Sequence, residues 1–309
     1  MPKLAVLDIG TNSIHMVLAE VQPDYTYKIL DRFKDMTRLG DGVFTSRRLS
    51  DQAMMRGLEV IRNLVTLARN KGYERIEGVA TSAVREARNG GEFLDHVAQQ
   101  TGLTVRVITG AEEARLIFLG VQNSVALPEP PTLVIDIGGG SVEVIVGNRE
   151  TIYQARSLKL GAIRLKDLYL TKTPPSKAML HELEEAVTGQ LKQALGTYKT
   201  KRVEQIIATS GMAGNLAEVI YLQRTGRPLQ QLNLTKISAK EIAAVEKRLA
   251  DATLKTRLAM PGLDPKRVDT LLPATIVFRV LLDLLRKDEL TICDKAIREG
   301  IIYDFIQRH

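Results

Sequence analysis

Two stretches of the sequence are nearly the same: residues 3–13 read KLAVLDIGTNS, and residues 132–141 read TLVIDIGGGS. Each is a short apolar run that ends in Asp-Ile-Gly and then, after two more residues, a serine. A second, mainly apolar run follows each copy, at residues 14–19 and 142–146. This pattern predicts a strand, a tight turn and another strand in both places. The repetition predicts two similar domains.

The rest of the chain alternates between helical and extended patterns. We assign residues 1–125 to the first domain and residues 126–309 to the second, with the proline-rich segment 128–131 as the linker. We expect the final helix, 294–309, to pack back on the first domain. Alternating elements are typical of the α/β class. Helices are expected at residues 51–70, 92–101, 111–121, 176–195, 214–221, 238–250, 275–286 and 294–307, and further strands at 76–81, 105–108 and 203–209.

Composition narrows the class of protein. Cys293 is the single cysteine, so the chain has no internal disulfide and no cysteine-based zinc cage. No apolar run approaches the ~18 residues of a membrane helix, and we expect a cytoplasmic protein with no membrane association. The net charge is +7, of which residues 1–125 contribute +1 and residues 126–309 contribute +6.

The excess of basic residues favours a polyanionic partner. Nucleic acid is not expected, because aromatic residues are only 5% of the chain and tryptophan is absent. Basic residues of the second half that are candidates for contacting a polyanion are Lys159, Arg164, Lys199, Lys201 and Arg202.

The two glycine-containing turns are candidate phosphate sites. A tight turn without large side chains exposes successive backbone N–H groups, which bind anions. A single turn of this kind is more simply a β-hairpin, but two matching turns, each preceded by an aspartate, favour a phosphate-binding pair. Neither matches a Walker or a dinucleotide-binding motif. The residues concerned are Gly10, Thr11, Asn12 and Ser13 in the first turn, and Gly138, Gly139, Gly140 and Ser141 in the second.

Three acids near these turns have the chemistry of magnesium ligands. Asp8 and Asp136 occupy equivalent places before the turns, and Glu143 interrupts an apolar strand after the second turn. Mg²⁺ prefers carboxylate oxygens and often bridges them to phosphate. A solvent-facing position is the simpler explanation of Glu143 alone.

Two further segments carry a candidate base and a candidate phosphate ligand. Glu112 and Glu113 open a predicted helix, where either could serve as a general base, and spacing alone does not choose between them. Their simpler role is to stabilise the helix N-terminus. Arg85 follows a predicted strand, and its planar guanidinium suits a phosphoryl group.

These motifs together resemble the exopolyphosphatase/guanosine pentaphosphate phosphatase (Ppx/GppA) family, a branch of the actin, sugar-kinase and Hsp70-like superfamily. The resemblance covers nearly the whole chain in family order. The matching segments are residues 8–13, 80–85, 109–115, 134–141 with Glu143, 160–165, 208–211, and 297–300 with Tyr303. One departure is Ser210-Gly211-Met212, where the family usually has Gly-Gly-Thr.

The resemblance implies two RNase H-like (actin-like ATPase) domains flanking a central cleft. It also implies that Glu113 is the catalytic base, that Arg85 contacts phosphate, and that Asp136 and Glu143 belong to the metal and phosphate site. We add Asp8 as a third metal ligand. The expected cofactor is Mg²⁺, with Mn²⁺ as an alternative, and the expected assembly is a homodimer.

The leading function is hydrolysis of the terminal phosphoanhydride bond of inorganic polyphosphate. Removal of the 5′-γ-phosphate of pppGpp is the close alternative. An ATP-dependent kinase of the same superfamily and a non-catalytic polyphosphate or nucleotide sensor are the alternatives from other classes.

Overall fold

The computed structural model describes residues 2–196 and 203–308. Two compact units are present: unit 1 comprises Met1–Gly120 and Ile297–His309, and unit 2 comprises Val121–Ala296. The chain passes between them within helix α5 (Gly110–Gln122), before the predicted boundary at residue 125. The proline-rich segment 128–131 therefore lies inside unit 2 and does not link the units, contrary to our expectation. The expected cleft stays a prediction.

Unit 1 is built on a five-stranded sheet with the order β3-β2-β1-β4-β5. The first predicted hairpin is its centre, because β1 pairs with β2 in antiparallel register and with β4 in parallel register. Every residue of β1 except its first is buried. The strands are β1 (Lys3–Ile9), β2 (Ile14–Val21), β3 (Tyr27–Asp35), β4 (Arg75–Ala80) and β5 (Val105–Val107).

Unit 2 repeats this arrangement in a six-stranded sheet with the order β10-β11-β9-β6-β7-β8. Strands β8-β7-β6-β9-β11 correspond in order to the five strands of unit 1, and β10 is added at the edge. The second predicted hairpin is β6 and β7. The repeat seen in the sequence is thus a repeat in topology. The strands are β6 (Thr132–Ile137), β7 (Val142–Gly147), β8 (Ile152–Leu158), β9 (Gln205–Thr209), β10 (Lys236–Ser238) and β11 (Glu289–Ile292).

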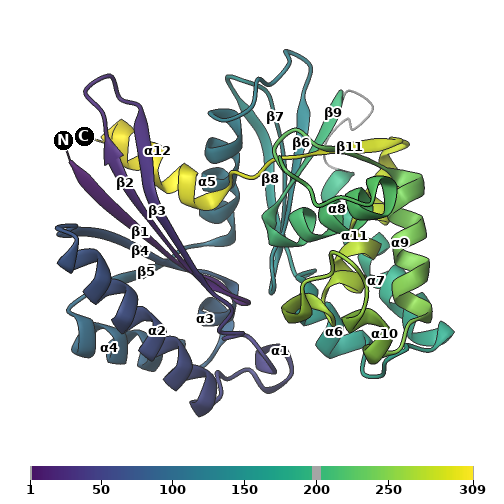
Figure 1. The fold of residues 1–309 in the computed structure, drawn as a ribbon, viewed down its shortest axis with the longest axis horizontal. Helices are drawn as coiled ribbons and strands as arrows, with labels where there is room; N and C mark the ends of the chain where they lie inside the picture. Colours follow the sequence, from purple (N-terminus) through teal and green to yellow (C-terminus); the bar gives the residue numbers. More distant parts are fainter. Residues whose placement is uncertain (1, 197–202, 309) are drawn as a thin grey trace. The chain divides into compact units, whose positions relative to one another are not determined.

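Helices cover the sheet of unit 1 on both faces, with α2 and α4 on one face and α5 and α12 on the other (Figure 1). The C-terminal helix α12 therefore belongs to unit 1, although it follows unit 2 in the sequence. The helices of this unit besides α5 are α1 (Val43–Ser46), α2 (Asp51–Asn70), α3 (Ser82–Glu86), α4 (Gly90–Thr101) and α12 (Ile297–Arg308).

The apolar core of unit 2 lies between its sheet and its helices. Helix α9 begins with the predicted capping box, in which Ser238 and Glu241 exchange side-chain and backbone hydrogen bonds. No helix among residues 2–196 and 203–308 is long and apolar enough to span a membrane. The helices are α6 (Ala162–Tyr169), α7 (Lys177–Leu195), α8 (Ser210–Thr225), α9 (Ala239–Asp251), α10 (Leu254–Leu258) and α11 (Leu271–Leu285).

Several predicted boundaries were wrong. Helix α8 begins at Ser210 and not at 214, and α11 begins at Leu271 and not at 275. Glycine or proline lies in the first turns of both helices, where such residues are tolerated although they look like breakers. Helix α12 begins at Ile297 and not at 294. The edge strands β3 and β8 were missed, because their many exposed residues resemble a loop.

Candidate active site

The first turn is a loop whose carbonyl groups are already bound. The Gly10 amide donates to the Ser13 carbonyl at 3.0 Å, while the carbonyls of Thr11 and Asn12 accept hydrogen bonds from the amides of Gly40 and Arg38 at 2.8 and 2.9 Å. The amides of Thr11, Asn12 and Ser13 donate to no group within residues 2–196 and 203–308. These N–H groups remain available to an anion.

The second turn has the same arrangement. The Gly138 amide donates to the Ser141 carbonyl at 3.0 Å. The carbonyls of Gly138 and Gly139 accept from the first amides of α6, at 2.9 and 2.8 Å, and the Gly140 carbonyl accepts from Arg164 Nε at 2.7 Å. Across the described part of the chain, the amides of Gly139, Gly140 and Ser141 find no acceptor. Both loops therefore have the geometry of a phosphate cradle.

Close backbone approaches hold both loops in place. A Cβ atom on Gly161, the residue before α6, would lie 2.2 Å from the Gly140 carbonyl carbon and 2.4 Å from the Ser141 nitrogen. A Cβ atom on Gly40 would lie 2.2 Å from Thr11 Cγ2. Sequence analysis gave Gly40 no role, because it is not part of the repeated stretch, and it named Gly161 only within the family segment 160–165.

The side chains of the first loop have different environments. Thr11 Oγ1 accepts a hydrogen bond from the Ala83 amide at 3.2 Å, which ties the loop to α3. Ser13 Oγ lies 2.8 Å from His15 Nε2. Asn12 Oδ1 is buried and has no hydrogen-bond partner in the described residues. Thr11 thus offers an anion its amide, while the Asn12 side chain retains an unsatisfied polar atom at the loop.

Glu113, in the first turn of α5, forms an ion pair with Arg85 of α3, in which the carboxylate is buried and the guanidinium is partly exposed. Arg85 Nη1 lies 2.9 Å from Glu113 Oε2 and donates a second hydrogen bond of 2.9 Å to the Ile108 carbonyl. The Glu113 side chain is 9% exposed, whereas that of Glu112 is 29% exposed and pairs with Arg106 at 3.0 Å. The two acids that the spacing could not separate are therefore separated by burial.

Burial raises the pKa of Glu113 to about 7. The Arg85 guanidinium opposes this rise in pKa, and the Asp8 carboxylate adds to it. A carboxylate with a pKa near neutrality is ionised in part at physiological pH and accepts a proton readily. Glu113 thus has the properties of a general base.

Asp8 is held by a residue from the far end of the chain. Arg298 Nη1, at the start of α12, lies 3.5 Å from Asp8 Oδ2. Burial raises the pKa of Asp8, and the positive charge of Arg298 opposes that rise. Sequence analysis did not assign a function to Arg298, since nothing in the local sequence pairs positions so far apart.

Asp136 and Glu143 stand directly opposite each other on β6 and β7. Their exposed fractions are 9% and 1%, so Glu143 is not a solvent-facing strand residue. Ser157 Oγ donates a hydrogen bond of 2.7 Å to Glu143 Oε1. In the described ranges no three His, Cys, Asp or Glu residues form a group that could hold a metal. A pair of buried carboxylates still suits Mg²⁺, which often takes one or two carboxylates and completes its shell with water and phosphate.

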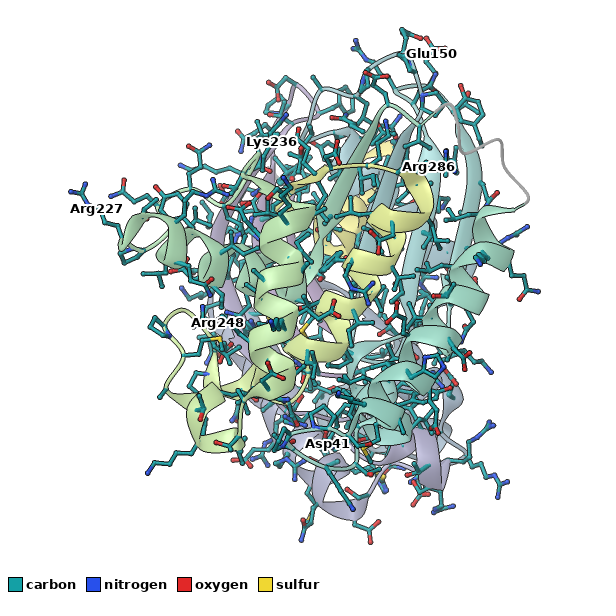
Figure 2. The ribbon with its side chains drawn as sticks, turned by 90° about the vertical axis from the view of Figure 1, so that its right-hand side faces the viewer. Asp41, Glu150, Arg227, Lys236, Arg248 and Arg286 are labelled. Atoms are coloured by element: carbon teal, nitrogen blue, oxygen red, sulfur yellow. The ribbon has the colours of Figure 1, made fainter. Side chains whose placement is uncertain are left out.

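The basic candidates of the second half fall into three groups. Lys159 is exposed, whereas Arg164 is buried and supports the Gly140 carbonyl. Lys199, Lys201 and Arg202 lie outside the described residues. Other exposed cations, such as Arg227 and Arg248, extend from the surface of unit 2 (Figure 2).

The segment Ser210-Gly211-Met212 departs from the family pattern, and there the buried Arg267 donates to the Met212 sulfur at 3.4 Å.

Comparison with known proteins agrees with this geometry. The model of the Ppx/GppA phosphatase family matches residues 14–309. The chain belongs to this family. Its members include exopolyphosphatase 2 of Mycobacterium tuberculosis, which is 30% identical and is aligned over 97% of this chain and 98% of its own length.

Two solved Ppx/GppA structures have the same fold. An exopolyphosphatase from Cytophaga hutchinsonii is 28% identical, with a TM-score of 0.90 over 99% of this chain and 98% of that one. The Aquifex aeolicus family member is 25% identical, with a TM-score of 0.82 over 99% and 98% of the two chains. The two sheets of this Ppx/GppA chain therefore form the actin-like α/β architecture that the motifs implied.

Two glycine-to-alanine substitutions in unit 2 should have opposite effects on the stability of the protein. Gly161→Ala places a methyl group against the Gly140 backbone, and we expect it to lower the free energy of unfolding by about 2 kcal/mol or more. Gly189→Ala is the matched control, because Gly189 is in helix α7 with no atom within 4 Å of the added Cβ. It should raise stability by up to about 1 kcal/mol. Denaturant unfolding measures both; an unchanged Gly161→Ala variant would contradict the close approach.

The environment of Glu113 predicts an unusually high pKa for its carboxyl group. In the folded protein the Glu113 carboxyl should titrate at about pH 7, well above an ordinary glutamate. Arg85→Gln removes a positive charge that favours the ionised form, so the pKa of Glu113 should rise further. NMR of ¹³C-labelled glutamate side chains, assigned with Glu113→Gln, measures this pKa. A pKa of about 4.3 in the wild type, the ordinary glutamate value, would show that burial does not govern this carboxyl.

Proposed function

We propose that this chain hydrolyses the terminal phosphoanhydride bond of inorganic polyphosphate and releases orthophosphate. The observation that carries the proposal is the Glu113–Arg85 pair, in which a buried carboxylate of raised pKa adjoins a phosphate-binding type of side chain. The family members from Mycobacterium tuberculosis and Cytophaga hutchinsonii both bear the name exopolyphosphatase, and they support the choice of substrate.

In the proposed reaction the Glu113 carboxylate accepts a proton from a water molecule. The water oxygen attacks the terminal phosphorus, and the bond from that phosphorus to the bridging oxygen breaks. The shortened chain leaves with the electron pair of that bond. A base with a pKa near the working pH is suited to this transfer.

Arg85 has two tasks in this reaction. Its Nη1 holds Glu113 and the Ile108 carbonyl, while Nε and Nη2 contact no acceptor in the described part of the chain. Those two nitrogens are therefore available to phosphoryl oxygens, which a guanidinium binds in a bidentate manner. The free amides of the first loop, in the same unit as Arg85, would stabilise charge that develops on phosphoryl oxygens, and the second loop offers amides of the same kind in unit 2.

In unit 2, Asp136 and Glu143 would hold Mg²⁺ or Mn²⁺, and Asp8 stays a separate candidate ligand in unit 1. When bound, such an ion neutralises part of the charge of the phosphate chain.

The groups of the candidate site are of types that bind phosphate, and they do not distinguish polyphosphate from pppGpp. Removal of the 5′-γ-phosphate of pppGpp therefore remains the alternative within the family. Phosphate release from both substrates in one competitive assay separates the two activities. The homodimer and the cytoplasmic location also stay predictions.

Glu113, the proposed base, has a matched control in its neighbour Glu112. Glu113→Gln removes the base but keeps the shape of the side chain, and we expect turnover of polyphosphate to fall by about 10² to 10⁴ with little change in KM. Glu112→Gln changes the partly exposed neighbour and should keep near wild-type turnover. Steady-state phosphate release measures both variants. The reverse pattern would assign the base to Glu112, and full activity of both would exclude either acid.

Metal removal tests the role of the two opposed acids. We expect polyphosphate hydrolysis to stop in excess chelator and to return with Mg²⁺ or Mn²⁺. Asp136→Asn and Glu143→Gln should each require more metal for half-maximal activity, because each removes one negatively charged oxygen ligand. Titration of activity against free metal gives these values. Full activity in chelator would remove the ion from the proposal.

A further inference from the structure

Helix α12 carries the segment Arg298-Glu299-Gly300, to which the proposed reaction assigns no task. The segment brings the helix into direct contact with α5, which carries Glu113. A Cβ atom on Gly300 would lie 1.8 Å from the Leu116 carbonyl oxygen and 2.6 Å from its carbonyl carbon. The two helix backbones therefore touch about one turn after Glu113.

A second contact joins the same two helices on the next turn of α12. Arg115 Nη2 of α5 lies 2.7 Å from Asp304 Oδ1. The Asp304 carboxylate also forms an ion pair with Arg308 within α12, with 3.1 Å between Asp304 Oδ2 and Arg308 Nε. Gly300 and Asp304 are spaced to lie on one face of the helix. That face of α12 thus meets α5 at Leu116 and at the neighbouring Arg115.

The start of α12 is itself anchored to the sheet of unit 1. Glu299 is fully buried and pairs with Arg32 of β3 at 2.9 Å. The neighbouring Arg298 pairs with Asp8 of β1. Moving the helix away from Arg32 would leave the buried Glu299 carboxylate without this partner, which is costly, so the attachment resists movement of the helix. The support that α12 offers to α5 is therefore rigid.

We propose that α12 positions the general base, with Gly300 and Asp304 setting where the first turn of α5, and with it the Glu113 carboxylate, stands relative to Arg85. The proposal rests on the proposed function in taking Glu113 as the base. Arg85 belongs to α3 and also donates to the carbonyl of Ile108, whose own amide is bound to Ala80 of β4, so displacement of α5 alters the 2.9 Å contact between Arg85 and Glu113. Displacements of about 1 Å in a catalytic group cost up to about 10² in rate.

Two matched arginines separate positioning from simple stabilisation. Arg115 and Arg308 both pair with Asp304, and their side chains are 45% and 47% exposed. Exposed pairs contribute about 1 kcal/mol or less, so Arg115→Gln and Arg308→Gln should change stability equally little. Only the Arg115 pair joins α12 to α5. We expect Arg115→Gln to lower kcat about threefold to tenfold with KM within twofold, and Arg308→Gln to leave both constants unchanged.

Gly300→Ala is the stronger variant, since the methyl group would clash with the Leu116 carbonyl and, with α12 anchored to the sheet, would displace α5. In folded protein it should lower kcat by about 10². It should also raise the pKa of Glu113 above the wild-type value, because Glu113 moves away from the Arg85 charge while the Asp8 carboxylate stays. The ¹³C titration of Glu113 reads this shift independently of activity. The result therefore remains interpretable if Glu113→Gln shows that Glu113 is not the base.

The outcomes are distinct. A shifted Glu113 titration and a selective loss of kcat support the positioning role. An unshifted titration in folded Gly300→Ala protein, or equal kinetics for Arg115→Gln and Arg308→Gln, overturns it. If Gly300→Ala does not fold, the arginine pair decides alone. Equal kinetics of the two arginine variants would then mean that α12 stabilises the fold without positioning Glu113.

Discussion

Arg85 and Glu113 form an ion pair of 2.9 Å at a place where the carboxylate is almost completely removed from water. Removing a carboxylate from water costs several kcal/mol, and a well-placed guanidinium offsets that cost. The balance of the two effects leaves the pKa of Glu113 at about 7. Too much burial would keep the acid protonated, and too strong a pairing would make it a weak base. The chemistry assigned to the site depends on this balance.

The elements around the pair serve to hold it. Helix α3 carries Arg85 and is tied to the first loop through Thr11, while α5 carries Glu113 and is supported by α12. The first loop, in the same unit, adds backbone amides whose neighbouring carbonyls are already bound, and unit 2 carries a second loop of the same kind. Both kinds of group are fixed before a substrate arrives. Such preorganisation is how phosphoryl-transfer sites stabilise developing charge.

Much of the fold could be predicted from the sequence, because the two repeated stretches carry strong local signals. Their apolar runs become central strands, and Asp8 and Asp136 occupy matching positions before the loops. The edge strands β3 and β8 could not be predicted, because an edge strand keeps polar residues and lacks the continuous apolar pattern. The proline-rich segment 128–131 was taken for a linker, although the chain changes unit earlier, within α5.

The candidate site was predictable as a set of residues but not as an arrangement. Spacing placed Glu112 and Glu113 together, and only tertiary packing shows which one is buried. The contacts of Gly161 with Gly140 and of Gly300 with Leu116 depend on helix packing, which no local pattern encodes. The same holds for Arg298 and Asp8, which pair across almost the entire sequence. Long-range contacts of this kind require the fold itself.

Hydrolysis of polyphosphate in ¹⁸O-labelled water under single-turnover conditions tests most directly whether water attacks the terminal phosphorus, as proposed. If Glu113 directs water to the terminal phosphorus, each released orthophosphate carries one ¹⁸O atom and the shortened chain carries none. Mass spectrometry of both products measures the label. Label in the shortened chain, with unlabelled orthophosphate, would mean that water attacks the inner phosphorus, and it would contradict the proposed role of the Arg85–Glu113 pair.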